Sequence, residues 1–379
     1  MTYDLILRGG RVIDPSQNLD AKLDVGFAGR TVAATGKSLP AGPATVVRDV
    51  SGQIVVPGLI DLHTHVYDGG TSLGIDAEHF CRISGVTTAV DTGSAGPGNW
   101  RGFRQHVIDR SQVRILAYLH VSHAGIFGFD RNVMVGEGED VRLMNPVDCA
   151  TVADANRDVI VGIKVRVGRN ASGSAGIAPL DMALQAGEEI GMPVMCHIDH
   201  PPPSYDDVLA RLRPGDILTH AFRPFPNSPI SAQGRVRGSV HAARKRGVLF
   251  DIGHGMGSFA FKTGRAMLAA GFLPDTISSD VHKLSINGPA FDQVTTMSKF
   301  LCLGMSLKDV VAASTVNAAM AMRRPELGSL KSGSVGDATV LDIVDGTHDY
   351  VDAVGEHLSG KQRIVSKGVV VGGKWWHPA

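Results

Sequence analysis

The chain has only four cysteines among its 379 residues, and no two of them are closely spaced. They stand at widely separated positions: Cys81, Cys149, Cys196 and Cys302. A disulfide framework is typical of small, cysteine-dense secreted domains, and a cysteine-based zinc site needs paired thiols. Both are excluded as organising features, and we expect reduced thiols in a cytoplasmic protein.

The sequence also lacks an excess of either charge and any long apolar run. Lys plus Arg and Asp plus Glu number 37 each, so bulk charge predicts neither nucleic acid nor an anionic membrane as a partner. No apolar stretch approaches bilayer-spanning length, and the first residues show no secretory signal. We expect a small-molecule substrate as the partner and leave a homo-oligomer open.

The middle of the chain instead contains a regular alternation of strand-like and helix-like segments. Such alternation is typical of a parallel sheet wrapped by helices, and eight repeats predict a (β/α)8 TIM barrel over residues 57–329. The predicted strands are 59–65, 86–92, 113–121, 159–166, 193–198, 216–221, 248–253 and 275–280. Short strand-like segments at both chain ends, residues 1–56 and 330–379, predict one small β-sandwich domain.

The first barrel strand carries the stretch around which we organise the interpretation, Pro57 to Val66. Side chains two apart on a strand share a face, so Asp61, His63 and His65 should project together. Two imidazoles on one face at a strand end form half of a site for zinc or a similar ion. A pair of hydrogen-bonded core histidines is the alternative for this motif alone.

The fourth predicted strand contains an inward-facing lysine. By alternation, one face of this strand should contact the helices and the other should point into the barrel. The face toward the helices consists of Val161, Ile163, Val165 and Val167. The face toward the interior consists of Gly162, Lys164, Arg166 and Gly168. A lysine inside a barrel is costly unless compensated. Lys164 could pair with Asp61 or Asp91. Alternatively, a lowered pKa would let it react with carbon dioxide to give a carbamate that bridges two cations.

Further ligand-type residues end other predicted strands. The fifth strand ends in His197, the sixth in His220 and the eighth in Asp280. The carboxyl ends of barrel strands meet at one rim, where barrel enzymes carry their chemistry. The sequence therefore predicts that these residues form one metal-dependent site with the first-strand histidines.

These residues resemble the metal-ligand set of the amidohydrolase superfamily, over essentially the whole chain. The resemblance is carried by His63-Thr64-His65, Lys164, His197, His220 and Asp280, and by Thr315-Val316-Asn317-Ala318-Ala319 with the glycine-rich segments after it. It implies a binuclear site, most often zinc, with His63, His65 and Asp280 on one ion and His197 and His220 on the other. Lys164 carboxylated by CO2, and a hydroxide, would bridge the ions. Asp280 would move the proton while an amide, cyclic amide or ester is hydrolysed.

Within this superfamily the motifs are most similar to the deacetylase-type, dihydroorotase-like subgroup. That resemblance implies removal of a small acyl group, such as acetyl, from an amino or hydroxy acid. Dihydroorotases typically carry an arginine where this chain has Tyr67. The alternative is a cyclic amide hydrolase of the dihydroorotase, dihydropyrimidinase or hydantoinase type. A mononuclear deacylase of N-acyl-D-amino acids and a non-catalytic scaffold rank lower, the scaffold because the ligand set is complete.

Three residues are the predicted substrate contacts: Tyr67, Arg166 and Arg169. Arg166 shares the inward face with Lys164, and its planar fork would suit a carboxylate; an ion pair with a barrel acid is the alternative. Arg223, in a loop after His220, ranks lower because loop arginines are usually solvated. The long segment 122–146 is interpreted either as a mobile cover over the site or as a surface insertion.

Overall fold

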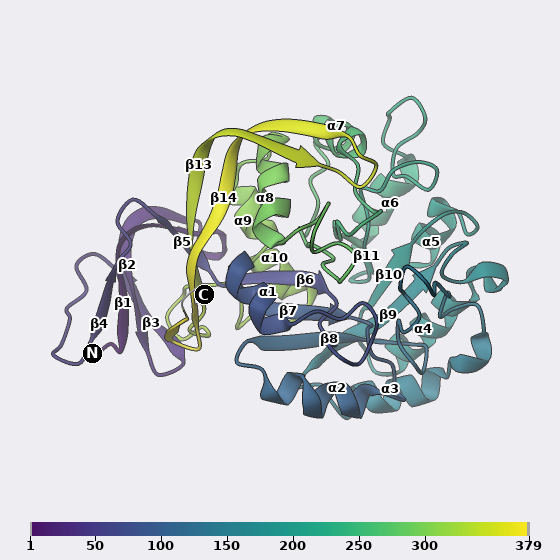
Figure 1. Ribbon diagram of the computed structural model, residues 1–379, viewed down its shortest axis with the longest axis horizontal. Helices are drawn as coiled ribbons and strands as arrows, with labels where there is room; N and C mark the ends of the chain where they lie inside the picture. Colours follow the sequence, from purple (N-terminus) through teal and green to yellow (C-terminus); the bar gives the residue numbers. More distant parts are fainter. Residues whose placement is uncertain (1, 377–379) are drawn as a thin grey trace.

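The computed structural model describes residues 2–376. Seven strands of the middle region form a parallel sheet in which each strand pairs with the next along the chain (Figure 1). They are β6 (Leu59–Thr64), β7 (Val86–Thr92), β8 (Arg114–His120), β9 (Ile160–Val167), β10 (Val194–Ile198), β11 (Ile217–Leu218) and β12 (Leu249–Phe250). Each overlaps a predicted strand, so the period of the apolar residues located them correctly.

The eighth predicted strand, 275–280, does not form a regular strand and pairs with its neighbours only through isolated β-bridges. Thr276 pairs with Asp251 beyond β12, and Val281 pairs with Thr64 of β6, both in parallel. The backbone N–H of Asp280 also donates to the carbonyl of His63 at 2.8 Å. The curled sheet is therefore closed by this segment, and its carboxyl end lies beside that of β6.

Helices follow the barrel strands and cover the outside of the sheet (Figure 1). They are α1 (Ala77–Ser84), α2 (Trp100–His106), α3 (Pro146–Asp154), α4 (Ala178–Glu189), α5 (Tyr205–Arg211), α6 (Gly238–Arg246), α7 (Phe261–Ala269), α8 (Gln293–Cys302), α9 (Leu307–Ala313) and α10 (Val316–Ala321). Their ends follow ordinary capping chemistry: Asp76 accepts a hydrogen bond at the start of α1, and Gly85 ends it with φ 73°. Among residues 2–376, no helix combines the length and apolarity needed to cross a membrane.

Two apolar clusters fill the barrel region. The larger lies between strands and helices and includes three of the four free cysteines, Cys81, Cys149 and Cys196. The smaller combines barrel residues with residues of and after α10; it contains Ile60, Leu62, Val90, Leu116, Tyr118, Val161, Met195, Ile217, Ala318, Ala319, Ala321, Met322 and Leu327. The placement of Val161 against the helices was wrong, because the β8–β9 register shifts at Ala117/Tyr118 and breaks the simple alternation.

Strands from the two ends of the chain form a second, eight-stranded sheet. They are β1 (Leu5–Asp14), β2 (Leu19–Ala28), β3 (Thr31–Gly36), β4 (Val46–Asp49), β5 (Ile54–Pro57), β13 (Ala338–Val351), β14 (His357–Val371) and β15 (Lys374–Trp376). In this sheet the N-terminal and C-terminal strands are joined by the antiparallel pairing of β5 with β13. Gly9 lies within β1, where the register with β2 shifts, and its φ is 77°. The sandwich and the domain boundaries stay predictions.

The β13–β14 hairpin reaches from this sheet to the barrel. Its two strands have 14 and 15 residues, and the hairpin lies beside α8 (Figure 1). At its tip, Lys299 of α8 donates to the carbonyl of Val351 at 2.9 Å and to that of Pro289 at 2.6 Å, and its Nζ lies 2.8 Å from His254 Nε2. The backbone N–H of Phe261 donates to Asp352 at 2.8 Å. The hairpin thus fixes both ends of the barrel loop 254–261.

Candidate metal centre and substrate cavity

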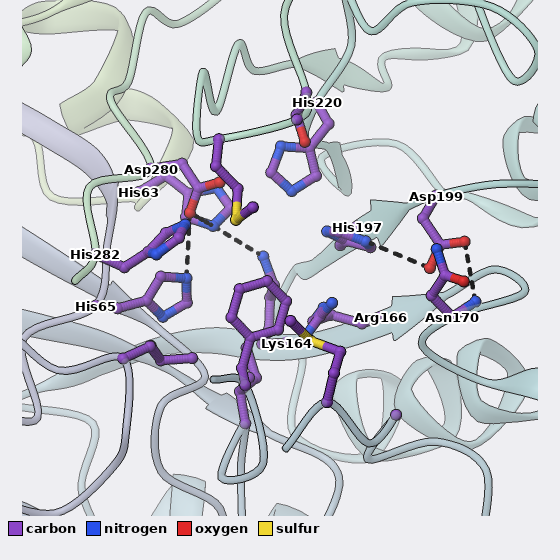
Figure 2. A pocket seen from close by; sticks show the side chains of 18 of the residues that line it. His63, His65, Lys164, Arg166, Asn170, His197, Asp199, His220, Asp280 and His282 are labelled. Atoms are coloured by element: carbon purple, nitrogen blue, oxygen red, sulfur yellow. Dashed lines mark hydrogen bonds and ion pairs between the residues drawn. The ribbon is translucent and has the colours of Figure 1, made fainter. Parts of the chain in front are cut away.

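All six predicted metal ligands reach one cavity at the carboxyl ends of the barrel strands. The cavity has a volume of about 260 Å³ and its wall includes His63, His65, Lys164, His197, His220 and Asp280. Figure 2 shows these side chains pointing toward a common space from separate strands and strand-end loops. This volume is slightly below the usual range of about 300–1,000 Å³ for small-molecule sites. Their roles as ligands stay predictions, whereas their convergence is a feature of the structure.

The tightest group in the cavity consists of His63, His65 and Asp280. Asp280 Oδ1 lies 3.4 Å from His63 Nε2 and 3.2 Å from His65 Nε2. One ligand atom from each residue lies within 4.8 Å of the other two, and all three residues are buried. Two imidazole nitrogens and a carboxylate oxygen converging in this way suit a divalent cation such as zinc.

A chain of hydrogen bonds behind His63 fixes which nitrogen faces the cavity. Thr219 donates its hydroxyl proton to Asp251 at 2.7 Å, so its oxygen must accept from Nδ1–H of His63, 2.9 Å away. The lone pair of His63 is therefore on Nε2, toward Asp280. His65 is held similarly, with Nδ1 3.0 Å from Ser94 Oγ. Such outer hydrogen bonds are the usual support of histidine ligands.

His197 and His220 form a second pair, with ring centroids 4.4 Å apart. Nδ1–H of His220 donates to the carbonyl of Gly253 at 2.7 Å, which leaves Nε2 as the free nitrogen. Nε2 of His197 is buried and has no hydrogen-bond partner among the described residues; Asp199 Oδ2 lies 3.9 Å away, too far for a hydrogen bond (Figure 2). A buried imidazole nitrogen without a hydrogen bond is costly, and a second cation would satisfy it.

Two of these residues occupy a backbone conformation that few side chains adopt. His220 has φ 62° and Asp280 has φ 48°. Left-handed backbone is unfavourable for residues other than glycine, although aspartate and histidine tolerate it better than most. Non-glycine residues in this region cluster at functional sites. Gly255, also at positive φ, lies so close that a Cβ there would be 2.1 Å from Asp280 Oδ2.

Lys164 is completely buried and lies beside the first histidine. Its Nζ is 3.3 Å from His63 Nε2, and within residues 2–376 it forms no ion pair with Asp61 or Asp91. Burial lowers the pKa of Lys164 to about 8. A larger fraction of the amine is therefore unprotonated at neutral pH than for a surface lysine. The structure gives no support to the predicted alternative of an ion pair with either carboxylate.

Burial also keeps the imidazoles of the site uncharged. It lowers the pKa of His65 to about 3 and those of His63, His197 and His220 well below the usual value. Neutral imidazole is the form that binds cations. The donor set therefore fits divalent metal ions in both composition and protonation.

Asp61 does not share the cavity with the two histidines that follow it, contrary to the predicted common face. Its carboxylate accepts from the Ser279 backbone N–H at 3.0 Å and from the Ser279 hydroxyl at 2.5 Å. The β6–β7 register shifts between Asp61 and Thr64, which changes the face on which the following side chains lie. Asp61 thus ties β6 to the closing segment 276–281.

Arg166, a predicted substrate contact, lines the cavity but already has a counterion. Its Nη1 lies 3.3 Å from Glu137 Oε2. The Ser122 backbone N–H donates to His120 Nδ1 at 2.9 Å, so the ring proton is on Nε2, which donates to Glu137 Oε1 at 3.2 Å. Burial would raise the pKa of Glu137, but Arg166 and His120 outweigh it and lower the pKa. Glu137 is therefore an anion that neutralises Arg166.

The acid that pairs with Arg166 belongs to the long segment 122–146, not to a barrel strand. The same segment supplies apolar side chains and backbone to the cavity wall: Ile126, Phe129, Met134, Val135 and Gly136. The interpretation as a surface insertion was wrong in this respect, because the segment forms one side of the site. Mobility of the segment stays a prediction.

Glu137→Gln is expected to lower the free energy of unfolding by about 2–3 kcal/mol, because it leaves the buried Arg166 without its counterion. Denaturant unfolding followed by circular dichroism measures this. Glu139→Gln is the matched control: Glu139 is exposed two residues away and should unfold like the parent protein. Equal midpoints for both variants would contradict the inferred anionic pairing.

The other two predicted substrate contacts do not reach the cavity wall. Tyr67 stacks on Phe103 with centroids 4.5 Å apart, and its hydroxyl donates to the carbonyl of Asn99 at 3.4 Å. Arg169 is exposed. Both follow strand ends, but the directions of their side chains depend on loop packing that alternation does not describe.

Two cavity residues, His282 and Arg223, are not among the three predicted substrate contacts. His282 is buried, and its Nδ1 accepts from the Leu284 backbone N–H at 3.2 Å, which leaves Nε2–H for another partner. Arg223 is only 4% exposed and lines the cavity. Arg223 follows the predicted ligand His220 by three residues, and this position could have indicated a place in the cavity wall. The assumption that loop arginines are solvated led to its lower rank.

The closed barrel and its rim of imidazoles and carboxylate define a metal-dependent hydrolase. No family model matches the chain. A deacetylase of Agrobacterium fabrum (strain C58) is 36% identical over 341 residues, which are 90% of this chain and 83% of that protein. A solved dihydroorotase has a TM-score of 0.90 with 33% identity over 98% of both chains. A solved adenine deaminase has a TM-score of 0.92 with 26% identity, covering 99% of this chain and 100% of that one.

The chain belongs to the amidohydrolase superfamily, in the group of deacetylases and dihydroorotase-like proteins. It is an enzyme of the metal-dependent amidohydrolase type. The predicted family is therefore confirmed. The names of its relatives differ in the bond that they act on, so the reaction is the subject of the proposal below.

Proposed function

We propose that the protein is a binuclear metal-dependent deacetylase that removes a small acyl group, such as acetyl, from an amino or hydroxy acid. The convergence of His63, His65 and Asp280 in a buried cavity supports hydrolysis. The 36% identity with a protein named as a deacetylase, over 90% of the chain, supports the acyl group as the part that is removed.

The residues present fit two divalent cations, with zinc as the proposed metal. His63, His65 and Asp280 would hold one, His197 and His220 the other, and Lys164 carboxylated by CO2 would link them. When bound, such cations supply Lewis acidity and lower the pKa of water to near neutrality. The buried Nε2 of His197, which has no hydrogen-bond partner within residues 2–376, is the observation that supports the second ion.

The protein residues then bind the substrate and move protons. Asp280 lies at the centre of the ligand group with Oδ2 against Gly255, and we assign to it proton transfer from water to the leaving group. His282 presents a neutral imidazole N–H beside Asp280 and is placed to hold the substrate oxygen. A buried site keeps bulk water from competing for these hydrogen bonds.

The apolar part of the cavity wall indicates an acid with an apolar side group. Six of its lining residues are large and apolar: Leu73, Ile126, Phe129, Met134, Val135 and Met256. Apolar surface favours ligands that cover it. A leaving acid with an aliphatic or aromatic substituent would fill this side while its acyl group faces the histidines.

The second candidate is hydrolysis of a cyclic amide such as dihydroorotate. It is supported by the 33% identity, over 98% of both chains, with a structure named as a dihydroorotase. The position after the first-strand histidines argues against it, because Tyr67 carries no positive charge and stacks on Phe103 away from the cavity.

We expect acyclic acetyl esters or amides of amino and hydroxy acids to be hydrolysed far faster than dihydroorotate. The rigid ring of dihydroorotate fixes the position of its carboxylate, and Tyr67 offers no charge there, whereas an acyclic acid can turn its carboxylate toward a cation elsewhere in the cavity. Loss of a charged partner for a buried carboxylate costs a few kcal/mol, which corresponds to roughly several hundredfold in kcat/KM. A panel of acetylated 2-amino and 2-hydroxy acids, assayed beside dihydroorotate and a hydantoin with zinc and bicarbonate present, measures this. Comparable kcat/KM for dihydroorotate and the best acetylated acid would contradict the deacetylase assignment.

A further inference from the structure

One charged side chain of the cavity wall, Arg223, has no directly paired anion among the described residues. Arg223 is 4% exposed, and its Nε and Nη1 are buried without hydrogen-bond partners. Within residues 2–376 it also forms no ion pair. The carboxylate of Asp199, which lines the same cavity, attracts Arg223 only from beyond ion-pair distance. A buried guanidinium without a directly paired anion is a costly arrangement that proteins rarely keep.

The backbone around Arg223 holds this side chain in place. Its N–H donates to the carbonyl of His220 at 3.2 Å, and its carbonyl accepts from the hydroxyl of Thr263 in α7 at 3.2 Å. The neighbouring Phe222 is buried and packs against Phe300. The side chain is therefore presented to the cavity by a fixed loop, three residues after a predicted metal ligand.

The other arginine of the cavity is unavailable for an incoming anion. Arg166 already lies against Glu137, whose second oxygen accepts from His120. A substrate carboxylate at Arg166 would have to displace Glu137 or lie beside it. At Arg223 an incoming carboxylate would meet Nε or Nη1, which have no partner among the described residues, and each of them forms with Nη2 a planar fork that suits two parallel hydrogen bonds.

We propose that Arg223 binds the carboxylate of the substrate and thereby selects acids over neutral compounds of the same shape. This assignment deepens the proposed function and replaces Arg166 as the carboxylate contact. Carbon 2 of the acid, which carries the acylated oxygen or nitrogen, then lies between Arg223 and the histidine ligands. The side group of the acid lies toward the apolar part of the wall. The substrate class is an acylated 2-amino or 2-hydroxy acid with a free carboxylate.

The experiment compares two ligands that differ only in charge, 2-hydroxy-4-methylpentanoate and its primary amide. Calorimetry on the metal-loaded protein measures their binding. For Arg223→Met we expect carboxylate binding to weaken by at least about 30-fold and amide binding to change by less than about threefold. Arg235→Met, an exposed arginine of the same connection, is the matched control and should bind both ligands like the parent protein.

Two further measurements keep the assignment falsifiable. Removing an unpaired buried charge should not lower the unfolding temperature, so a large loss in Arg223→Met would show a hidden partner and overturn the proposal. Arg223→Lys, which keeps the charge but not the fork, should bind the carboxylate with intermediate affinity. Equal weakening of the acid and the amide in either variant would also overturn it.

Failure of this inference is distinguishable from failure of the proposed function. If the parent protein hydrolyses acetylated acids but Arg223→Met weakens the binding of acids and amides equally, the proposed function is supported and the carboxylate site is wrong. If the parent protein hydrolyses no acetylated acid but Arg223→Met selectively loses carboxylate binding, the carboxylate site is supported and the deacetylase assignment is wrong.

Discussion

Lys164→Ala is expected to lose most of the bound metal and to lower kcat/KM by about a thousandfold or more. The parent protein should contain about two divalent ions per chain after reconstitution with zinc and bicarbonate. Lys164 is the one fully buried amine of the described cavity wall, 3.3 Å from a predicted ligand nitrogen and without a carboxylate partner. A carbamate at this position would carry a negative charge between the ions, and alanine cannot replace it. Loss of the cations removes several kcal/mol of transition-state stabilisation.

Elemental analysis and steady-state kinetics measure both effects. Lys245→Ala, a change at an exposed lysine of α6, is the control for a general effect of removing an amine. A short carboxylic acid such as acetate should partly restore metal and activity to Lys164→Ala, since it can occupy the vacated space with a carboxylate. Two ions retained in Lys164→Ala, or an unmodified amine in a high-resolution map of the fully metallated protein, would contradict the carbamate.

Asp280→Asn is expected to lower kcat by about a thousandfold with a smaller change in KM. Asparagine has the same shape and tolerates the left-handed backbone at φ 48°, so the local fold should persist. It retains one oxygen near His63 and His65 but loses the charge and the basicity that proton transfer requires. General acid–base groups typically contribute 10²–10⁴-fold, about the loss predicted here.

Comparison with Asp280→Ala separates chemistry from backbone conformation. Alanine should give a similar loss of kcat and in addition lower the free energy of unfolding by about 1 kcal/mol, because it tolerates positive φ less well. Kinetics, metal content and thermal unfolding on the same preparations give the three readouts. If Asp280→Asn keeps both ions and stays within tenfold of the parent kcat, Asp280 does not transfer the proton.

The barrel and the convergence of its polar residues could be predicted because both follow from period and topology. Parallel strands place their carboxyl ends at one rim, so His63, Lys164, His197 and His220 had to meet once the strands were located. The apolar period that locates the strands, and the residue at each strand end, can both be read directly from the sequence. The closing segment 276–281 was located too, although it pairs through only isolated bridges.

The errors arose where register or loop packing decides the direction of a side chain. Asp61 and Val161 lie at or near shifts in strand pairing, which strict alternation does not anticipate. Glu137 and Arg223 are charged residues in loops, and composition alone assigns such residues to solvent. Their burial depends on long-range contacts with β8, β9 and α7, which have no local signature in the sequence.

The bracing of loop 254–261 by the β13–β14 hairpin has a consequence for biosynthesis. Met256, Gly257 and Ser258 of this loop line the cavity, yet the groups that hold it, Val351 and Asp352, follow every barrel strand in the chain. A ribosome adding about 5–20 residues per second reaches them only several seconds after the loop. During that interval the histidines of the cavity lack the part of the wall that loop 254–261 supplies when the hairpin holds it in place. We therefore expect the proposed metal site to be completed only after the barrel strands, and a nascent chain paused before residue 351 should bind zinc weakly.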